Sequence, residues 1–120
     1  MIEGIGVDIV DIARIEAAVK RQPRFARRIL TETEFATFEQ SQSRRGLEFL
    51  AGRFALKEAV AKAWGTGISD MLSWQDIETS RNERGKPEVR VKGAEQSRVH
   101  ASLSHTDEQV VAYVIVEEEV

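Results

Sequence analysis

The feature that most constrains the fold of this 120-residue chain is the segment 47–64, LEFLAGRFALKEAVAKAW. Its leucine, alanine, glutamate and lysine residues favour a helix, and Gly65 follows where a left-handed C-cap belongs. The segment is apolar almost all round the helical cylinder, whereas a surface helix has only one apolar stripe. We therefore predict a long, largely buried helix, and a chain of this length has room for one core around it.

The residues before this helix predict a strand and a first helix. Residues 2–10 alternate in the manner of a strand, with apolar side chains on one face and two glycines and Asp8 on the other. Asp11 stands at a helix N-cap position, an apolar stripe follows at helical spacing, and Pro23 ends or interrupts that helix. The face with Asp8 carries almost no other side chains, which suits either close packing against a helix or a carboxylate kept clear for a metal or a phosphate.

The remaining segments complete the expected fold. Thr31 and Glu34 have the spacing of a capping box that starts a second helix, and the polar residues 44–46 separate it from the long helix. The later strands are expected at residues 74–79, 88–92, 99–105 and 109–117, with a turn at 82–87 and a hairpin across 106–108. A strand, three helices and then antiparallel strands favour an α+β fold in one domain spanning residues 1–120.

Composition excludes several classes of site. The chain has no cysteine, which rules out a disulfide framework, a thiolate metal site and a cysteine nucleophile. No apolar run approaches the roughly 20 residues of a membrane span. Glu3 and Asp8 interrupt the apolar residues at the N-terminus, and no basic segment precedes them. We therefore predict a cytoplasmic protein with no membrane partner.

Charge is distributed unevenly along the chain. The net charge of −3 disfavours a general nucleic-acid binder, yet residues 12–28 hold six basic residues against one acidic residue, a net charge of +5. Phe25 is the only aromatic residue of this basic segment, whereas RNA-binding surfaces interleave aromatic and basic residues, so no nucleic acid is expected. The segment is either a solvated face or a docking surface for an acidic partner.

Glu58 and Lys62 are the first candidates for chemistry. They lie four residues apart on the long helix, where a surface salt bridge is the ordinary interpretation. On so apolar a helix, however, the pair is expected to be partly buried and to need further partners. Asp8, on the bare face of the first strand, is the natural one. Two carboxylates beside a lysine suit Mg²⁺ carrying a phosphate ester. The alternative is that the glycines of the strand only allow a helix to pack closely, with Asp8 at an edge of that contact.

Three further motifs have ordinary structural interpretations. His105 ends the stretch SLSH, and no nucleophile elbow supports a Ser-His-Asp hydrolase. Residues 65–67, Gly-Thr-Gly, either stop the long helix or offer N–H groups to a phosphate. Residues 85–87, Gly-Lys-Pro, are most simply a hairpin turn.

Four segments together resemble the holo-acyl-carrier-protein synthases, which are short, single-domain phosphopantetheinyl transferases. They are GVDIVDIARIE (6–16), FLAGRFALKEAVAKAWGTGI (49–68), GKP (85–87) and SLSH (102–105). Their order and spacing and the length of the chain all agree with that family, over essentially the whole sequence. The resemblance implies the 4′-phosphopantetheinyl transferase fold.

The resemblance also implies an activity and a site. The family transfers 4′-phosphopantetheine from coenzyme A to a serine of apo-acyl carrier protein in fatty acid biosynthesis, requires Mg²⁺ and releases adenosine 3′,5′-bisphosphate. By motif, Asp8 and Glu58 are metal ligands and Lys62 contacts the coenzyme A phosphates, all three being catalytic. The acceptor of the serine proton is either Glu58 or a metal-bound water. The family forms homotrimers with active sites between subunits. The other coenzyme A contacts implied are Arg53, Gly65, Thr66, Gly67, Gly85, Lys86, Pro87 and His105.

The resemblance supplies a partner for the basic segment, because acyl carrier proteins are small and acidic. Arg14, Arg21 and Arg28 recur every seven residues, and with Arg24 and Phe25 they are expected to form the docking surface. Association there should be fast and sensitive to salt. The alternative function is a non-catalytic basic-helix docking module for an acidic protein partner, and dependence on a divalent metal separates the two.

Overall fold

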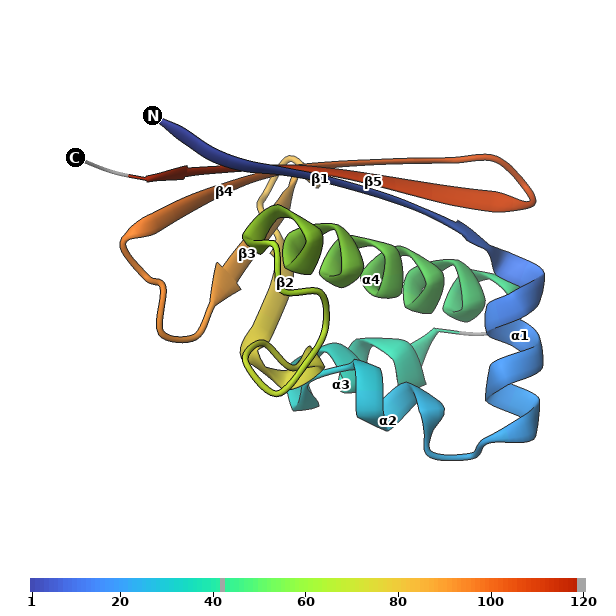
Figure 1. The fold of residues 1–120 in the computed structure, drawn as a ribbon. Helices are drawn as coiled ribbons and strands as arrows, with labels where there is room; N and C mark the ends of the chain where they lie inside the picture. The colour runs from blue at the N-terminus through green and yellow to red at the C-terminus, as the bar shows by residue number, and fades with distance from the viewer. Residues whose placement is uncertain (42, 119–120) are drawn as a thin grey trace.

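A computed structural model describes residues 1–41 and 43–118 (Figure 1). Strands β1, β5 and β4 form an antiparallel sheet in that order, and β2 and β3 form a separate antiparallel pair. The helix α4 lies under the three-stranded sheet, with α2 and α3 on its other side and α1 at one end (Figure 1). The elements are β1 (Ile2–Asp11), α1 (Ile12–Arg21), α2 (Phe25–Ile29), α3 (Glu32–Gln40), α4 (Ser43–Trp64), the 3-10 turn η1 (Trp74–Asp76), β2 (Ile77–Arg81), β3 (Pro87–Val91), β4 (Ser97–His105) and β5 (Gln109–Glu118).

Glycines in β1 set the position of α4 beneath the sheet. A Cβ atom added at Gly6 would lie 1.8 Å from the carbonyl oxygen of Ala59, and one at Gly4 would lie 1.9 Å from that of Ala63. The two backbones therefore approach more closely than any side chain allows. The helix ends at Gly65, whose φ of +81° is the left-handed conformation expected of a C-cap. The prediction of a long, largely buried helix is confirmed.

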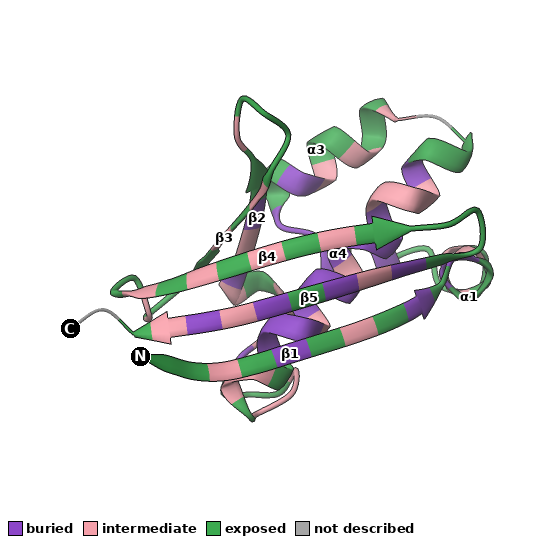
Figure 2. Ribbon diagram, turned by 90° about the horizontal axis from the view of Figure 1, so that it is seen from above, coloured by how far each residue is buried: buried purple, intermediate pink, exposed green. Residues whose placement is uncertain are grey.

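The sheet has two different faces (Figure 2). The inner face packs alternate β5 side chains, Ala112, Val114 and Val116, into the core against α4. On the outer face, β1 exposes Ile5 by 57%, Val7 by 50% and Ile9 by 58%, and β5 exposes Tyr113 by 44%. The pairing of β1 with β5 places these side chains side by side, which makes one continuous apolar surface open to solvent.

The α+β fold, the capping box at Thr31 and Glu34 and the final hairpin are as predicted, but three local predictions are wrong. The helix α4 begins at Ser43, because the arginines of the supposed break at 44–46 are good helix formers. A 3-10 turn replaces the start of the strand expected at 74–79, where Ser73 N–H donates to Asp76 Oδ2. The five-residue helix α2 was not foreseen, so the described residues hold four α-helices rather than three.

The N-cap of α1 also differs in detail from the expectation. Asp11 occupies that position, but its side chain makes no capping hydrogen bond. Its Oδ1 instead accepts a hydrogen bond of 2.9 Å from Gln109 Nε2, which ties the end of β1 to the start of β5. In the part of the chain that the structure describes, no helix has both the length and the apolar character needed to cross a membrane.

Candidate functional site

The predicted convergence of Asp8 and Lys62 is present in the structure. Asp8 shares the inward face of β1 with the glycines that face α4, and Lys62 lies on the last turn of that helix. Lys62 Nζ donates hydrogen bonds to Asp8 Oδ1 at 2.9 Å and to the carbonyl oxygen of Val7 at 3.0 Å. The close contact between β1 and α4 therefore brings a strand carboxylate within reach of a helix ammonium.

Glu58 completes this group of charges one turn earlier on α4. Burial raises the pKa of Glu58, the negative charge of Asp8 raises it further, and the positive charge of Lys62 acts against both. The carboxyl is only partly buried, so it stays open to a ligand from solvent. The negative charges of the two carboxylates attract a cation to the space between them.

The donor set fits Mg²⁺ better than a metal that needs a complete protein cage. Among the described residues, no three histidine, aspartate or glutamate side chains gather in one place. Magnesium is commonly held by one or two carboxylates, with waters and substrate phosphates filling the remaining positions. Asp8 and Glu58 match that requirement, and Lys62 offers a positive charge to a phosphate beside them.

A cavity of about 580 Å³ adjoins the two carboxylates and joins them to the basic segment. Arg14 and Arg21 of α1 line it together with Asp8 and Glu58. Phe25 also lines it, but as a buried side chain whose ring lies 6.1 Å from that of Phe54. Phe25, which the sequence analysis places in the docking surface, is therefore part of the wall of this cavity.

The remaining docking candidates lie apart from that cavity. Arg24 and Arg28 line a separate depression of about 420 Å³ with Gln22 and Arg27. The seven-residue recurrence does not place all the arginines on one face, because the break between α1 and α2 interrupts the helical register. The basic segment consequently has two surfaces, one beside the carboxylates and one on α2.

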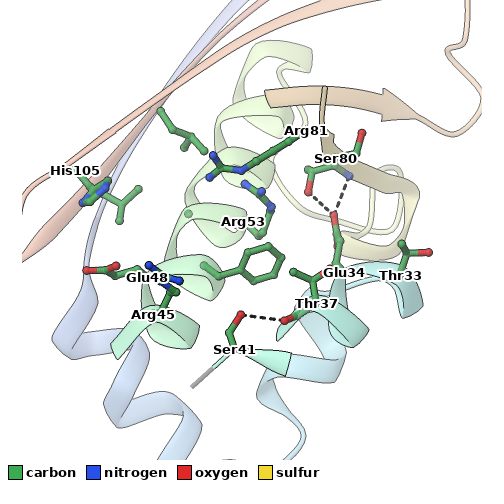
Figure 3. Close-up of a pocket in the computed structure, with 15 residues that line it drawn as sticks. Thr33, Glu34, Thr37, Ser41, Arg45, Glu48, Arg53, Ser80, Arg81 and His105 are labelled. Carbon is green, nitrogen blue, oxygen red and sulfur yellow. Dashed lines mark hydrogen bonds between the residues drawn. The ribbon is translucent and has the colours of Figure 1, made fainter. Parts of the chain in front are cut away.

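Arg53 lies in a second cavity, of about 480 Å³, between α3, α4, β2 and the hairpin of β4 and β5 (Figure 3). Its side chain is only 3% exposed, and its guanidinium carbon lies 4.7 Å from the centre of the Phe49 ring. Burial and then the positive charge of Arg81 lower the pKa of Arg53 to about 10. Arg45 and His105 line the same cavity (Figure 3).

This second cavity holds basic and acidic groups together: Glu34 and Glu48 line it beside Arg53, and the charge of Glu34 acts to raise the pKa of Arg53. No carboxylate among the described residues forms an ion pair with Arg53. A buried guanidinium with another arginine as its neighbour favours a ligand that carries negative charge. The cavity shares no lining residue with the one beside Asp8 and Glu58, so one chain holds the two groups of predicted site residues apart.

The two glycine-containing motifs are turns. Gly67, with φ of +62°, follows the end of α4, and Thr66 Oγ1 donates to its carbonyl oxygen at 2.8 Å. Gly85, with φ of +81°, shapes the turn between β2 and β3, which leaves Lys86 exposed. Neither motif lines the cavities that hold Arg53 or Asp8.

Sequence reasoning missed a buried ion pair on the opposite side of α4. Lys57 is fully buried, and its Nζ donates to Glu34 Oε1 at 2.7 Å, to the carbonyl oxygen of Ile29 at 2.8 Å and to that of Trp74 at 3.0 Å. Glu34 Oε2 accepts from Thr79 N–H at 2.8 Å and from Thr79 Oγ1 at 2.6 Å. A lysine on a helix that is apolar all round needs such a partner, and that was the available signal.

Known proteins resemble this chain over nearly its whole length. The model of a family described as the 4′-phosphopantetheinyl transferase superfamily matches residues 4–114. A holo-[acyl-carrier-protein] synthase of Bacillus velezensis is 51% identical over 117 residues, which cover 98% of this chain and 97% of that protein. That of Bacillus subtilis is 48% identical over 117 residues, with the same shares covered.

Solved structures of the same kind of protein are similar to this chain as well. A holo-(acyl-carrier-protein) synthase from Bacillus anthracis in complex with CoA (3′,5′-ADP) has a TM-score of 0.91 at 44% identity, and 99% of each chain is covered. That of Helicobacter pylori in complex with coenzyme A has a TM-score of 0.83 at 35% identity, with 94% of this chain and 99% of that chain covered.

Proposed function

The chain belongs to the 4′-phosphopantetheinyl transferase superfamily, and from this membership we propose that it transfers 4′-phosphopantetheine from coenzyme A to a serine of an apo-acyl carrier protein. The reaction would depend on Mg²⁺, release adenosine 3′,5′-bisphosphate and serve fatty acid biosynthesis in the cytoplasm. Residues 1–120 would act as one transferase domain. The observation that carries the proposal is that Asp8 and Glu58 line one cavity with two arginines, while Lys62 donates a hydrogen bond to Asp8.

The proposed site assigns a role to each charged group. Asp8 and Glu58 would hold Mg²⁺, which when bound offsets the negative charge of the coenzyme A diphosphate. Lys62 Nζ lies 2.9 Å from Asp8, and its side chain is 50% exposed, so it can turn toward a phosphate oxygen. There it would hold the diphosphate and stabilise the charge that develops on the leaving group.

The chemistry needs no nucleophile from this chain. The serine oxygen of the carrier protein would form a bond to the phosphorus of the phosphopantetheinyl group, and the pyrophosphate bond of coenzyme A would break. The serine proton would pass to Glu58 or to a water, and the electrons of the broken bond would leave with adenosine 3′,5′-bisphosphate. The contribution of Asp8, Glu58 and Lys62 is therefore to position the reactants and to stabilise charge.

We propose that the complete site forms between subunits of a homotrimer. Arg53 and His105 lie in a cavity separate from Asp8 and Glu58, so a neighbouring copy would bring the two groups together. The nucleotide end of coenzyme A would then lie against Arg53 and His105, with the turns 65–67 and 85–87 as further contacts. The exposed apolar outer face of the sheet supports such self-association, because adjoining exposed apolar side chains often mark an interface between proteins.

The acidic carrier protein would dock on the basic segment. Arg14 and Arg21 open into the cavity beside the carboxylates, and Phe25 forms part of its wall, which suits delivery of a serine to that place. Arg24 and Arg28 would extend the contact over α2. Complementary charge makes this association fast and weakens it as salt rises.

Intact-mass spectrometry tests the proposal. Apo-acyl carrier protein mixed with this chain, coenzyme A and Mg²⁺ should gain about 340 Da, the mass of the phosphopantetheinyl group, and a chelator should abolish the gain. The variant Asp8→Asn, which keeps the shape of the side chain, should show the same loss in the presence of Mg²⁺. If several carrier proteins bind without any gain in mass, the chain is a docking module and the transfer proposal is wrong.

A further inference from the structure

The short helix α2 ends in carbonyl groups whose partners come from outside the helix. The last four carbonyl groups of any helix find no N–H donor within it, and α2 has only five residues. Gln75 Nε2 donates to the carbonyl oxygens of Arg27 and Arg28, each at 3.2 Å, and to that of Leu30 at 2.8 Å. Lys57 Nζ donates to the carbonyl oxygen of Ile29 at 2.8 Å. The two N–H groups of the Gln75 amide are thus shared among three carbonyls, and Lys57 serves the fourth. We call these two side chains the α2 cap.

The α2 cap is held by elements that are themselves fixed. Gln75 belongs to η1, which is closed by the hydrogen bond of 3.0 Å from Ser73 N–H to Asp76 Oδ2. A hydrogen bond of 2.8 Å from the N–H of Lys92, the residue after β3, to the carbonyl oxygen of Asp76 holds η1 beside that strand. Lys57 belongs to the middle of the buried helix α4. The cap therefore ties a surface helix to the rigid core, rather than to another surface segment.

Such an anchor matters because five residues do not make a stable helix alone. Helices shorter than about 12 residues are marginal in water and depend on tertiary contacts. Packing supplies one contact: the Phe25 ring stacks 6.1 Å from Phe54, whose ring lies 5.0 Å from that of Trp74. The α2 cap supplies the polar contact at the opposite end of the same helix.

The α2 cap also affects the partial negative charge of the last carbonyl groups of α2. Free carbonyls at a helix C-terminus carry partial negative charge, which repels an acidic partner. Gln75 places its amide hydrogens on the carbonyls of Arg27 and Arg28, the two residues whose side chains help to line the basic depression. These hydrogen bonds therefore reduce the partial negative charge at the C-terminal end of α2.

Lys57 links the end of α2 to the helix that carries Glu58. It precedes Glu58 directly on α4, so one rigid helix carries both the ammonium that holds the end of α2 and the carboxylate proposed to bind metal. Gln75 fixes the rest of the α2 C-terminus from η1, whose Trp74 carbonyl oxygen accepts a hydrogen bond from the same Lys57 Nζ at 3.0 Å.

We propose that Gln75 is a positioning residue for the carrier protein: through the carbonyls of α2 it fixes the basic face of that helix relative to Asp8 and Glu58. This proposal rests on the proposed function, in which α2 docks an acidic carrier protein. Gln75 touches neither coenzyme A nor metal in that scheme, so its effect is confined to the protein substrate.

The test is a set of single substitutions followed by steady-state kinetics and binding. Gln75→Met keeps the length of the side chain and removes its donors, and Gln96→Met makes the same exchange at an exposed position in the turn between β3 and β4. For Gln75→Met we expect the KM for apo-acyl carrier protein to rise about fivefold to tenfold, the effect of losing one or two modest hydrogen bonds. The kcat and the KM for coenzyme A should stay within about twofold of wild type, and Gln96→Met should match wild type throughout.

Two further measurements make the result decisive. Gln75→Lys restores donors toward the carbonyls and should return the KM for the carrier protein to the wild-type value or below it. Amide hydrogen exchange over residues 25–30 should be faster in Gln75→Met than in wild type or Gln96→Met, and this readout does not depend on activity.

The outcomes separate this proposal from the proposed function. A wild-type chain that transfers phosphopantetheine, with an unchanged carrier-protein KM in Gln75→Met, overturns the positioning role alone. Equal losses in kcat or in coenzyme A affinity also overturn it, because they indicate general structural damage. A wild-type chain that neither binds nor modifies the carrier protein overturns both.

Discussion

Two lysines on α4, five residues apart, have opposite environments. Lys57 is fully buried and donates to three acceptors, one of them the buried carboxylate of Glu34. Lys62 has a side chain that is 50% exposed and contacts Asp8 at the edge of a cavity that Glu58 also lines. The first group of charges is closed and buried, and the second is open to solvent, with two carboxylates beside one lysine.

The pKa directions express the same contrast. Burial acts to raise the pKa of Glu34, but the charge of Lys57 and the hydrogen bonds from Lys57, Thr79 and Thr31 outweigh it, so the pKa is lowered. For Glu58, burial and the charge of Asp8 act in the same direction, and the pKa is raised. A carboxylate with all its partners inside the protein stabilises the fold, whereas one that still lacks a partner is available for a ligand.

Breaking the closed group should have the largest effect on stability. Lys57→Met keeps much of the side-chain volume but leaves Glu34 buried without its counter-charge, and this should lower the free energy of unfolding by about 3–5 kcal/mol. Urea unfolding followed by circular dichroism measures the loss. The double variant Lys57→Met with Glu34→Leu should recover part of it, since no buried charge remains. Equal stability of the two variants would contradict this account of the pair.

The sequence predicted the open group better than the closed one, for physical reasons. Local spacing was enough to connect Glu58 with Lys62 on one face of a helix, and the strand face bared by glycines indicated Asp8 as a partner for them. The partners of Lys57 are Glu34 and the carbonyls of Ile29 and Trp74, and they come from three other elements. Nothing local to α4 places those elements against it.

The helices and strands also differ in how far the sequence predicted them. The long helix, the first strand and the final hairpin have strong local periodicity, and all three were predicted. The helix α2 contains only five residues and depends on Gln75, Lys57 and the stacking of Phe25, so tertiary contacts decide its existence. The separation of Arg53 from Asp8 was likewise beyond local patterns, because it depends on which side of α4 each neighbouring element covers.

Breaking the open group should affect activity rather than folding. Glu58→Gln keeps the size of the side chain but loses the charge that would hold Mg²⁺, so kcat should fall about 100-fold or more while the protein stays folded. The KM for coenzyme A should change much less than kcat if Glu58 also accepts the serine proton. Steady-state transfer assays over a range of Mg²⁺ concentrations measure both. An active Glu58→Gln variant with normal metal dependence would exclude the assignment of Glu58 as a ligand.

Moving the open group without removing a charge tests its geometry. In Gly6→Ala the new Cβ would overlap the carbonyl oxygen of Ala59, so α4 must shift away from β1, at a cost of about 1–3 kcal/mol. The shift alters the distance between Asp8 and Glu58, so the apparent affinity for Mg²⁺ should fall as well. The closed group lies on the other side of α4, and Gly93→Ala, at a positive φ of +85° but with nothing near its Cβ, is a control for glycine replacement. Weaker metal affinity should appear only in Gly6→Ala.

The smallest effect concerns the pH dependence of stability without metal. The folded-state pKa of Glu58 is raised above the ordinary 4.5, so the folded protein disfavours its ionised form, and this destabilises the fold at neutral pH. Glu58→Gln lacks that penalty and should therefore melt slightly above wild type at pH 7 in a chelator.

The gain should shrink as the pH falls through the raised pKa and vanish below the ordinary value, because wild-type Glu58 is then protonated in both states. Mg²⁺ should reverse the order at pH 7, since only wild type binds it and is stabilised by it. Thermal melts of the two proteins between pH 4 and 7.5, with chelator and with Mg²⁺, provide the comparison. A wild type that melts above Glu58→Gln at pH 7 in the chelator would mean that Glu58 is satisfied within the fold, as Glu34 is.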